Sequence, residues 1–175
     1  MRQTGRKKVV LTQEMIDLLA TYTIGCVATV RADGTPAVSP KATFLVVDEP
    51  TIAFANIRSP GTVENLRRRA DVEANFINVF ARKGCRVRGR ARYLSREDAE
   101  PALQSRFEEK WPDLFDMIRG FVLIDLTGAE VLTSPSYDVG ASAGQLTEHW
   151  LHLYAGNLGF SVTGNARGVH DAAES

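Results

Sequence analysis

The sequence has few of the residues on which hydrolytic catalysis and metal binding depend. It contains three histidines, all near its C-terminal end, and two cysteines, Cys26 and Cys85, which lie far apart. A Ser-His-Asp triad needs a histidine base. The two cysteines do not have the spacing of zinc ligands, and the pair His149 and His152 lacks further ligands at the spacing of a zinc site. No glycine-rich Rossmann or P-loop motif occurs. We therefore expect no metal site, no hydrolytic triad and two buried, reduced thiols.

Long hydrophobic runs are also absent. No apolar stretch approaches the roughly 20 residues needed to span a bilayer. The N-terminus, MRQTGRKKVV, has basic residues without the apolar segment of a secretory signal. We expect no membrane partner and a cytoplasmic location. A chain of 175 residues suits one domain, and we assign residues 1–160 to that domain and residues 161–175 to a flexible C-terminal tail.

The net charge is zero, but the charges are unevenly placed. Residues 56–96 carry eleven Lys or Arg against three Asp or Glu, whereas residues 97–175 carry four against thirteen. Such asymmetry in a neutral chain favours a local anion site over a general affinity for nucleic acid. Pairing of the acidic part with the basic middle is the alternative. We expect no nucleic-acid partner.

Hydrophobic periodicity and turn residues predict a mainly β protein with helices. Helices are expected at residues 12–22, 63–69, 96–110, 113–118 and 146–154. Strands are expected at residues 24–30, 36–47, 51–55, 72–80, 85–93, 121–126 and 130–133. The first three strands, linked by tight turns, suggest a meander. Short strands at regular spacing predict a small antiparallel barrel decorated by helices, with a sandwich as the alternative.

The strand expected at residues 85–93, CRVRGRARY, has arginine at every second position. Arg86, Arg88, Arg90 and Arg92 share one face of an extended segment, because side chains alternate along a strand. Four like charges repel one another unless anions or acidic side chains lie opposite. Nucleic acid is the less favoured anion, because few aromatic residues lie between the arginines.

The stretch FANIRSPGTVENL, residues 54–66, has the pattern of an anion-binding loop. It runs from the end of a strand through a Ser-Pro-Gly turn into a helix that begins near Thr62. Hydroxyl groups, backbone N–H groups and the positive end of a helix dipole meet in such a turn and suit a phosphate. Arg58 or Arg86 could supply a cation for charge-assisted bonds. A plain helix cap by Ser59 and Thr62 is the alternative.

Three segments in succession resemble the FMN-binding split-barrel family related to pyridoxamine 5′-phosphate oxidase. They are ADGTPAVSPKATFLV (residues 32–46), TIAFANIRSPGTVENLRRRADVEANFI (51–77) and RKGCRVRGRARYLS (82–95). The resemblance spans about residues 12–134. It implies a small antiparallel split β-barrel that forms a homodimer, with FMN at the subunit interface and a small-molecule substrate.

The resemblance also implies which residues surround the cofactor. Positions that match the strands beside the flavin ring are Ser39, Pro40, Lys41, Ala42, Ala55 and Asn56. Ser59 and Thr62 match the phosphate-binding turn, and Asn65 matches an asparagine of the helix after it. Arg86 matches a polar or basic position on the strand after the Lys-Gly turn. Arg58 is a further candidate for the cation beside the phosphate.

Two departures from the family pattern narrow the expected function. True oxidases carry an Arg-Lys pair where this chain has Pro60-Gly61, and a C-terminal Arg-Leu-His-Asp-Arg segment where it has SPSYD, residues 134–138. Oxidation of pyridoxamine phosphate is therefore not expected. Thr62 replaces a lysine common in deazaflavin-binding branches, which favours FMN over a deazaflavin. We predict an FMN-dependent oxidoreductase with unassigned catalytic residues. The alternatives are a deazaflavin-dependent reductase and a noncatalytic module for a flavin or haem-like ligand.

Overall fold

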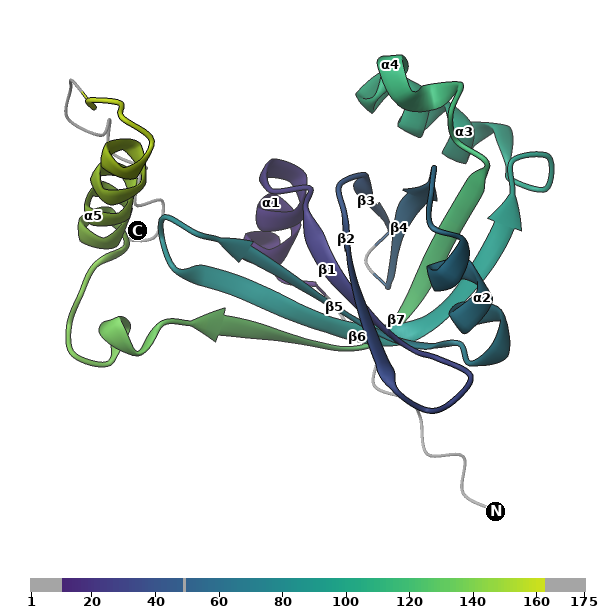
Figure 1. Cartoon of the computed structure of the whole chain (residues 1–175), viewed down its shortest axis with the longest axis horizontal. Helices are drawn as coiled ribbons and strands as arrows, with labels where there is room; N and C mark the ends of the chain where they lie inside the picture. The colour runs from purple at the N-terminus through teal and green to yellow at the C-terminus, as the bar shows by residue number, and fades with distance from the viewer. Residues whose placement is uncertain (1–10, 49, 163–175) are drawn as a thin grey trace.

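The computed structural model describes residues 11–48 and 50–162 of the chain (Figure 1). The helices are α1 (Gln13–Thr21), α2 (Pro60–Arg68), α3 (Pro101–Lys110), α4 (Pro112–Phe115) and α5 (Ala143–Asn157), with a 3₁₀ turn η1 (Pro135–Tyr137). The strands are β1 (Gly25–Val30), β2 (Pro36–Lys41), β3 (Phe44–Asp48), β4 (Thr51–Asn56), β5 (Asp71–Asn78), β6 (Lys83–Ser95) and β7 (Gly120–Thr133). No described helix is long and apolar enough to cross a membrane. Most of the predicted tail, residues 163–175, lies outside the described residues.

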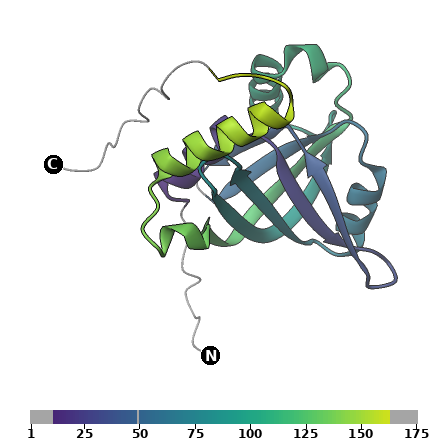
Figure 2. The same ribbon diagram turned by 60° about the vertical axis from the view of Figure 1, so that its left-hand side comes forward.

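The seven strands form one antiparallel sheet in the order β2-β1-β5-β6-β7-β4-β3. The predicted mainly β, antiparallel class is therefore confirmed. Figures 1 and 2 show that the sheet is strongly curved. Helices α1 and α2 pack near its curved part, and α5 lies near the β5–β6 turn and the C-terminal end of β7. β2 and β3 are the two edges and are not hydrogen-bonded to each other. The predicted barrel is therefore not closed.

The segment predicted as one strand at residues 36–47 is two strands at opposite edges of the sheet. β2 pairs with β1, as the predicted hairpin requires, whereas β3 pairs with β4. Between them Ala42 and Thr43 leave the strand ladder. The Thr43 hydroxyl accepts a hydrogen bond from the Ala55 amide at 3.0 Å, in place of a backbone partner. Both hairpin pairings of the predicted meander are therefore present, but its middle strand is divided, with the two halves at opposite edges of the sheet.

Two hydrophobic clusters hold the sheet in shape. The larger lies beneath α1, where the ring of Phe44 packs against Phe76 with centroids 4.6 Å apart and against Phe54 at 5.3 Å. The second packs α3 and α4 against β3, β4 and β7, with the rings of Phe107 and Phe121 4.8 Å apart. Burying each such ring contributes about 1.5 to 3 kcal/mol. The two clusters fix the strands from which the candidate site is built.

Several predicted boundaries are shifted by local chemistry. The Ser95 hydroxyl accepts the Asp98 amide at 3.2 Å, but this pair forms a turn rather than a helix start. α3 begins instead at Pro101, where a missing N–H group is tolerated. The two strands predicted at residues 121–133 are one continuous strand, β7. α5 begins earlier than predicted, after a capping box at Ser142.

The two cysteines differ in exposure. Cys85 is fully buried, as predicted, and burial raises the pKa of its thiol to about 11. Cys26 is exposed and unpaired with any described cysteine. Alternate residues of β1, beginning with Gly25, point into the core, so Cys26 points outward. The prediction that both thiols are buried is therefore wrong for Cys26.

Candidate functional site

A cavity of about 510 Å³ lies between the edge strand β2 and helix α2. Its lining residues come from β1, β2, the turn between them, and α2 with the loop before it. They are Thr29, Arg31, Ala32, Ala37, Val38, Ser39, Arg58, Ser59, Pro60, Gly61, Thr62, Glu64, Asn65 and Arg68. The predicted cofactor residues that meet in this cavity are Ser39, Arg58, Ser59, Thr62 and Asn65.

The start of α2 has two hydroxyl groups that make no side-chain hydrogen bond within the described part of the chain. Ser59 is the N-cap residue, yet its side chain makes no capping hydrogen bond, and its amide donates to Asn56 Oδ1 at 3.1 Å. Thr62 is only 8% exposed, and no side-chain hydrogen bond found among the described residues uses its hydroxyl. A plain cap therefore does not explain Ser59. The first-turn amides of a helix also lack intrahelical partners, so this end can receive an anion.

Asn65 fixes α2 against the sheet. Its Nδ2 donates to Thr29 Oγ1 at 3.0 Å, and Thr29 is buried on β1. Val63 and Leu66, on the same helix, are buried as well. Asn65 thus lines the cavity while joining α2 to β1, and this bond orients the helix start relative to β2.

Three arginines give the cavity a positive lining. Arg68 Nη2 lies 2.9 Å from Glu64 Oε1, and Arg31 donates through Nη1 to the carbonyl of Pro36 in its own turn. No ion pair among the described residues involves Arg58. With Glu64 as the one carboxylate in the lining, three guanidinium groups leave a surplus of positive charge. Arg31 and Arg68 were not predicted, because the sequence places one in a turn and the other in an arginine run typical of a solvated helix face.

The other residues predicted beside the flavin ring do not line this cavity. Lys41 is 8% exposed, its ammonium donates to the Ser39 hydroxyl, and burial lowers the pKa of its side chain. The remaining ones are Ala55 and Asn56, which are buried at the end of β4, and Pro40 and Ala42, which are exposed. Their contact with a cofactor stays a prediction.

Arg86 lies on the outer face of β6 and is absent from the cavity lining. Its Nη2 is 2.9 Å from Glu130 Oε1 and its Nε is 3.7 Å from Glu73 Oε1. The hydrogen bond from Arg86 lowers the pKa of Glu130. The arginines at positions 90 and 92 pair with carboxylates of β5 and β7. Acidic side chains therefore lie opposite most of the arginine face, and the assignment of Arg86 to a cofactor stays a prediction.

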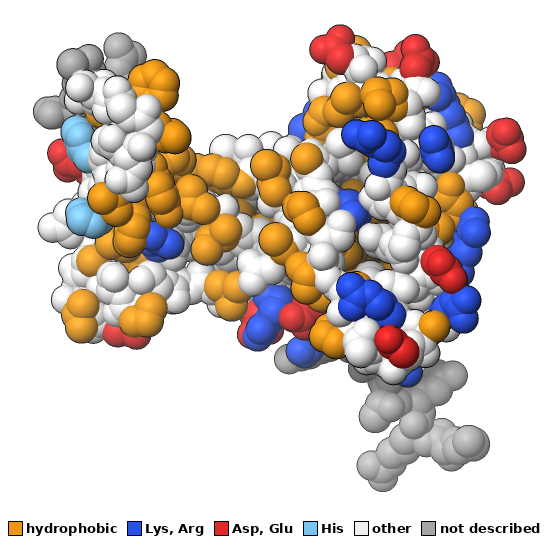
Figure 3. Space-filling model, viewed as in Figure 1, with side chains coloured by type: hydrophobic (Ala, Val, Ile, Leu, Met, Phe, Trp, Pro, Cys, Tyr) orange, Lys and Arg blue, Asp and Glu red, His pale blue; other side chains and the backbone are white. Residues whose placement is uncertain are grey.

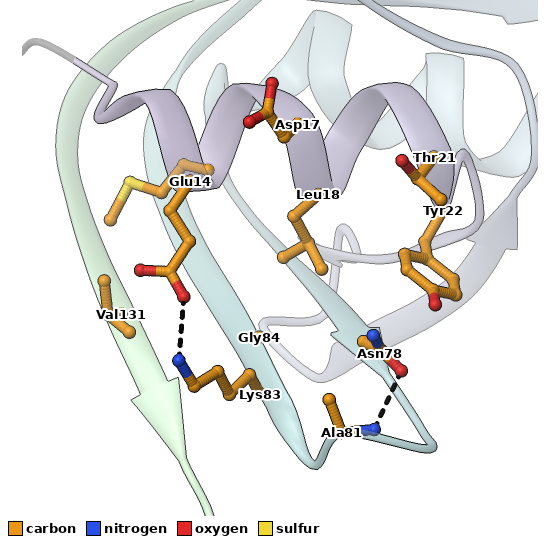
Figure 4. A pocket seen from close by; sticks show the side chains of 11 residues that line it. Glu14, Asp17, Leu18, Thr21, Tyr22, Asn78, Ala81, Lys83, Gly84 and Val131 are labelled. Carbon is orange, nitrogen blue, oxygen red and sulfur yellow. Dashed lines mark hydrogen bonds and ion pairs between the residues drawn. The ribbon is translucent and has the colours of Figure 1, made fainter. Parts of the chain in front are cut away.

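A second cavity, of about 410 Å³, lies between α1 and the β5–β6 hairpin (Figure 4). Met15, Leu18 and Val131 give it an apolar lining, which is typical of ligand pockets. Its one lining cation, Lys83, is already paired with Glu14 Oε1 at 3.2 Å. No group of three or more His, Cys, Asp or Glu among the described residues could hold a metal ion. The α2 cavity, which offers unused donors and positive charge, is therefore the candidate site.

The family model described as pyridoxamine 5′-phosphate oxidase matches residues 11–135. This range contains every strand of the sheet and the whole α2 cavity. The chain belongs to this family. The resemblance stated from the sequence is thereby confirmed. Among curated protein sequences, none matches the chain.

Solved structures share the fold of this family member at low sequence identity. HupZ of group A Streptococcus is 24% identical, with a TM-score of 0.62 over 71% of this chain and 95% of that one. An FMN-binding protein of Syntrophomonas wolfei is 12% identical, with a TM-score of 0.59 over 70% of this chain and 86% of that one. A protein named F420 reductase is 22% identical, with a TM-score of 0.51 over 69% of this chain and 98% of that one. These likenesses show the fold alone.

Proposed function

We propose that this family member binds a flavin phosphate at the start of α2, with FMN preferred to a deazaflavin. The observation that carries the proposal is the uncapped helix start, where the hydroxyls of Ser59 and Thr62 line a cavity with surplus positive charge. A phosphate monoester carries close to two negative charges at neutral pH, and charge-assisted hydrogen bonds are stronger than neutral ones. Family membership and the names of an FMN-binding protein and an F420 reductase of the same fold support a flavin-type ligand.

The chain's own residues would hold and orient this cofactor. Ser39 on β2 lines the same cavity as α2, and the Lys41 ammonium bonded to it is a buried cation on the strand expected beside the flavin ring. A bound flavin supplies hydride or electron transfer, so we propose an oxidoreductase that acts on a small molecule. Glu64, the one carboxylic acid in the lining, is paired with Arg68. This lack of a free proton donor favours a noncatalytic flavin-binding module as the second candidate function.

We also propose that a second copy of the chain covers the outer face of β1 and β2. Ile24 and Val38 are 63% and 67% exposed, and Val38 faces outward with Pro40 and Cys26 in the β1–β2 register. Figure 3 shows hydrophobic side chains along the hollow between α5 and the rest of the molecule. An exposed apolar patch of this kind marks an interface. Val38 also lines the α2 cavity, so this interface and the cofactor would meet, as the family resemblance implies.

The test is an absorption spectrum of the purified protein after addition of FMN and desalting. Retained FMN that is reduced by NAD(P)H and reoxidised by a small molecule supports the enzyme, whereas retained FMN without turnover supports the binding module. The double variant Ser59→Ala, Thr62→Ala is expected to lose FMN while keeping the wild-type circular dichroism spectrum. Wild-type protein that retains neither FMN nor a deazaflavin at micromolar concentration would overturn the proposal.

A further inference from the structure

The turn between β5 and β6 contains an arginine in a left-handed backbone conformation. Arg82 has φ 56° and is the only non-glycine residue with positive φ among the described residues. Its amide donates to the Asn78 carbonyl at 2.9 Å, and its carbonyl accepts the Ser134 amide at 3.0 Å. Glycine or asparagine adopts this conformation with less strain. Strained residues of this kind cluster at binding sites, which directs attention to the Arg82 side chain.

The Arg82 guanidinium is held in place by α5 and has no counter-anion among residues 11–48 and 50–162. It lies over the ring of Trp150, 3.4 Å from the centroid, and Nη2 donates to the Tyr154 hydroxyl at 3.5 Å. Its Nε is buried and makes no hydrogen bond. No ion pair among the described residues involves Arg82, whereas the adjacent Lys83 is paired with Glu14. The described part of the chain therefore presents an oriented guanidinium without a paired carboxylate.

Arg82 lines a cavity of about 460 Å³ together with Trp150 of α5. Ile77 and Leu132 give the cavity apolar surface; they share one face of the sheet, because both lie beside Gly84 in the strand register. None of its lining residues belongs to the α2 cavity. A guanidinium on an aromatic ring binds planar carboxylates and phosphates well, and apolar walls with a few fixed polar groups are typical of small-molecule sites.

We propose that this cavity is a second binding site, for a small aromatic anion. The carboxylate or phosphate of the ligand lies on the Arg82 guanidinium, and the aromatic ring lies against Ile77 and Leu132. Carboxylate and phosphate share the oxygen geometry that a guanidinium recognises. If Arg82 served only to attach α5 to the hairpin, the cavity would have no preference for anions.

Tryptophan fluorescence tests the proposal on the full chain. Trp111 is the other of the two tryptophans, so a Trp111→Phe background leaves Trp150 as the reporter. We expect benzoate or phenyl phosphate to quench its emission saturably, and the tighter of the two identifies the preferred anion. Benzyl alcohol, a neutral molecule of similar shape, should bind at least about 10-fold more weakly. No saturable quenching by either anion up to about 10 mM would overturn the proposal.

A matched pair of variants separates binding from attachment of α5. Ile77→Glu places a carboxylate in the lining of the Arg82 cavity at a position that is 47% exposed, and we expect it to bind the probe at least about 10-fold more weakly than Ile77→Gln, because the carboxylate competes for the guanidinium. Ile77→Gln has nearly the same shape without the charge and loses the same apolar contact, so the difference between the two variants reports the charge alone. Both should keep the wild-type melting temperature, because α5 keeps its contacts. Equal probe affinities for the two variants would also overturn the proposal.

Discussion

Two serines at helix starts give a matched test of the candidate site. Ser59 and Ser142 are both N-cap residues, but only Ser142 uses its side chain. Its Oγ accepts the Gln145 amide at 3.2 Å, and Gln145 Oε1 accepts the Ser142 amide at 2.8 Å. We predict that Ser142→Ala lowers the free energy of unfolding by about 1 kcal/mol, the usual value of a cap, or about 2 to 4 °C in melting temperature. Ser59→Ala should change stability much less, because no capping bond is lost.

The affinity for FMN should show the reverse order. A hydrogen bond to a charged group is worth about 1.5 to 3 kcal/mol, so Ser59→Ala should raise the Kd for FMN about 10- to 150-fold. Ser142→Ala should leave the Kd within about twofold, since that serine lies outside the α2 cavity. FMN fluorescence titration gives the Kd, and thermal unfolding of the cofactor-free protein gives the stability. A Ser59→Ala variant that is as destabilised as Ser142→Ala and binds FMN normally would refute the reasoning, because Ser59 would then be an ordinary cap.

The remaining predictions concern the thiols, the buried lysine and the apolar patch. In a monomeric Val38→Glu variant, where no second copy covers the β1–β2 face, Ellman's reagent should modify the exposed Cys26 quickly and the buried Cys85 only on unfolding, and equal rates would contradict the orientation of β1. The Cys85 thiol has a pKa of about 11 in the folded chain and about 8.5 when unfolded. The free energy of unfolding should therefore fall as pH rises between these values, and Cys85→Ala should flatten this slope in denaturant titrations. The lowered pKa of Lys41 shows that burial disfavours its charged form. Lys41→Met should thus raise stability at neutral pH, where the ammonium is otherwise buried charged, and weaken FMN binding; a less stable variant at pH 7 would count against this. In sedimentation, Val38→Glu should give monomers, whereas Val139→Glu, at a position 86% exposed, should sediment as wild type does.

Elements set by neighbouring residues could be predicted from the sequence. Thr12 caps α1 by accepting the Met15 amide, Pro112 ends the helix before it, and the alternation in β6 separates arginines from the core. The division between β2 and β3 could not be predicted, because it depends on the contact of Thr43 with Ala55, twelve residues away. Strand order and closure rest on such long-range pairings, which a local pattern does not contain.

The candidate site divides in the same way. The helix after β4 was predicted, because helix signals are local, but it begins at Pro60 rather than near Thr62. The expected Ser-Pro-Gly turn is therefore the N-cap and first two residues of α2, where a proline is well tolerated. Whether the Ser59 hydroxyl caps the helix depends on its rotamer and φ, and these follow from the packing of α2. Arg31 reaches the same cavity from the β1–β2 turn, and Arg86 is occupied by carboxylates on two neighbouring strands. Both outcomes depend on which segments the fold brings together.

The α2 cavity lies across the opening of the sheet. β2 is one edge, and α2 follows β4, the neighbour of the other edge. A ligand bonded to Ser39 and to the start of α2 therefore crosslinks two ends of the sheet that no strand pairing connects. A ligand that binds only the folded chain adds about 2.7 kcal/mol to the free energy of unfolding at 100 times its Kd. Without it, β2 should exchange its amide hydrogens early, and cofactor loss should therefore precede unfolding of the edge hairpin.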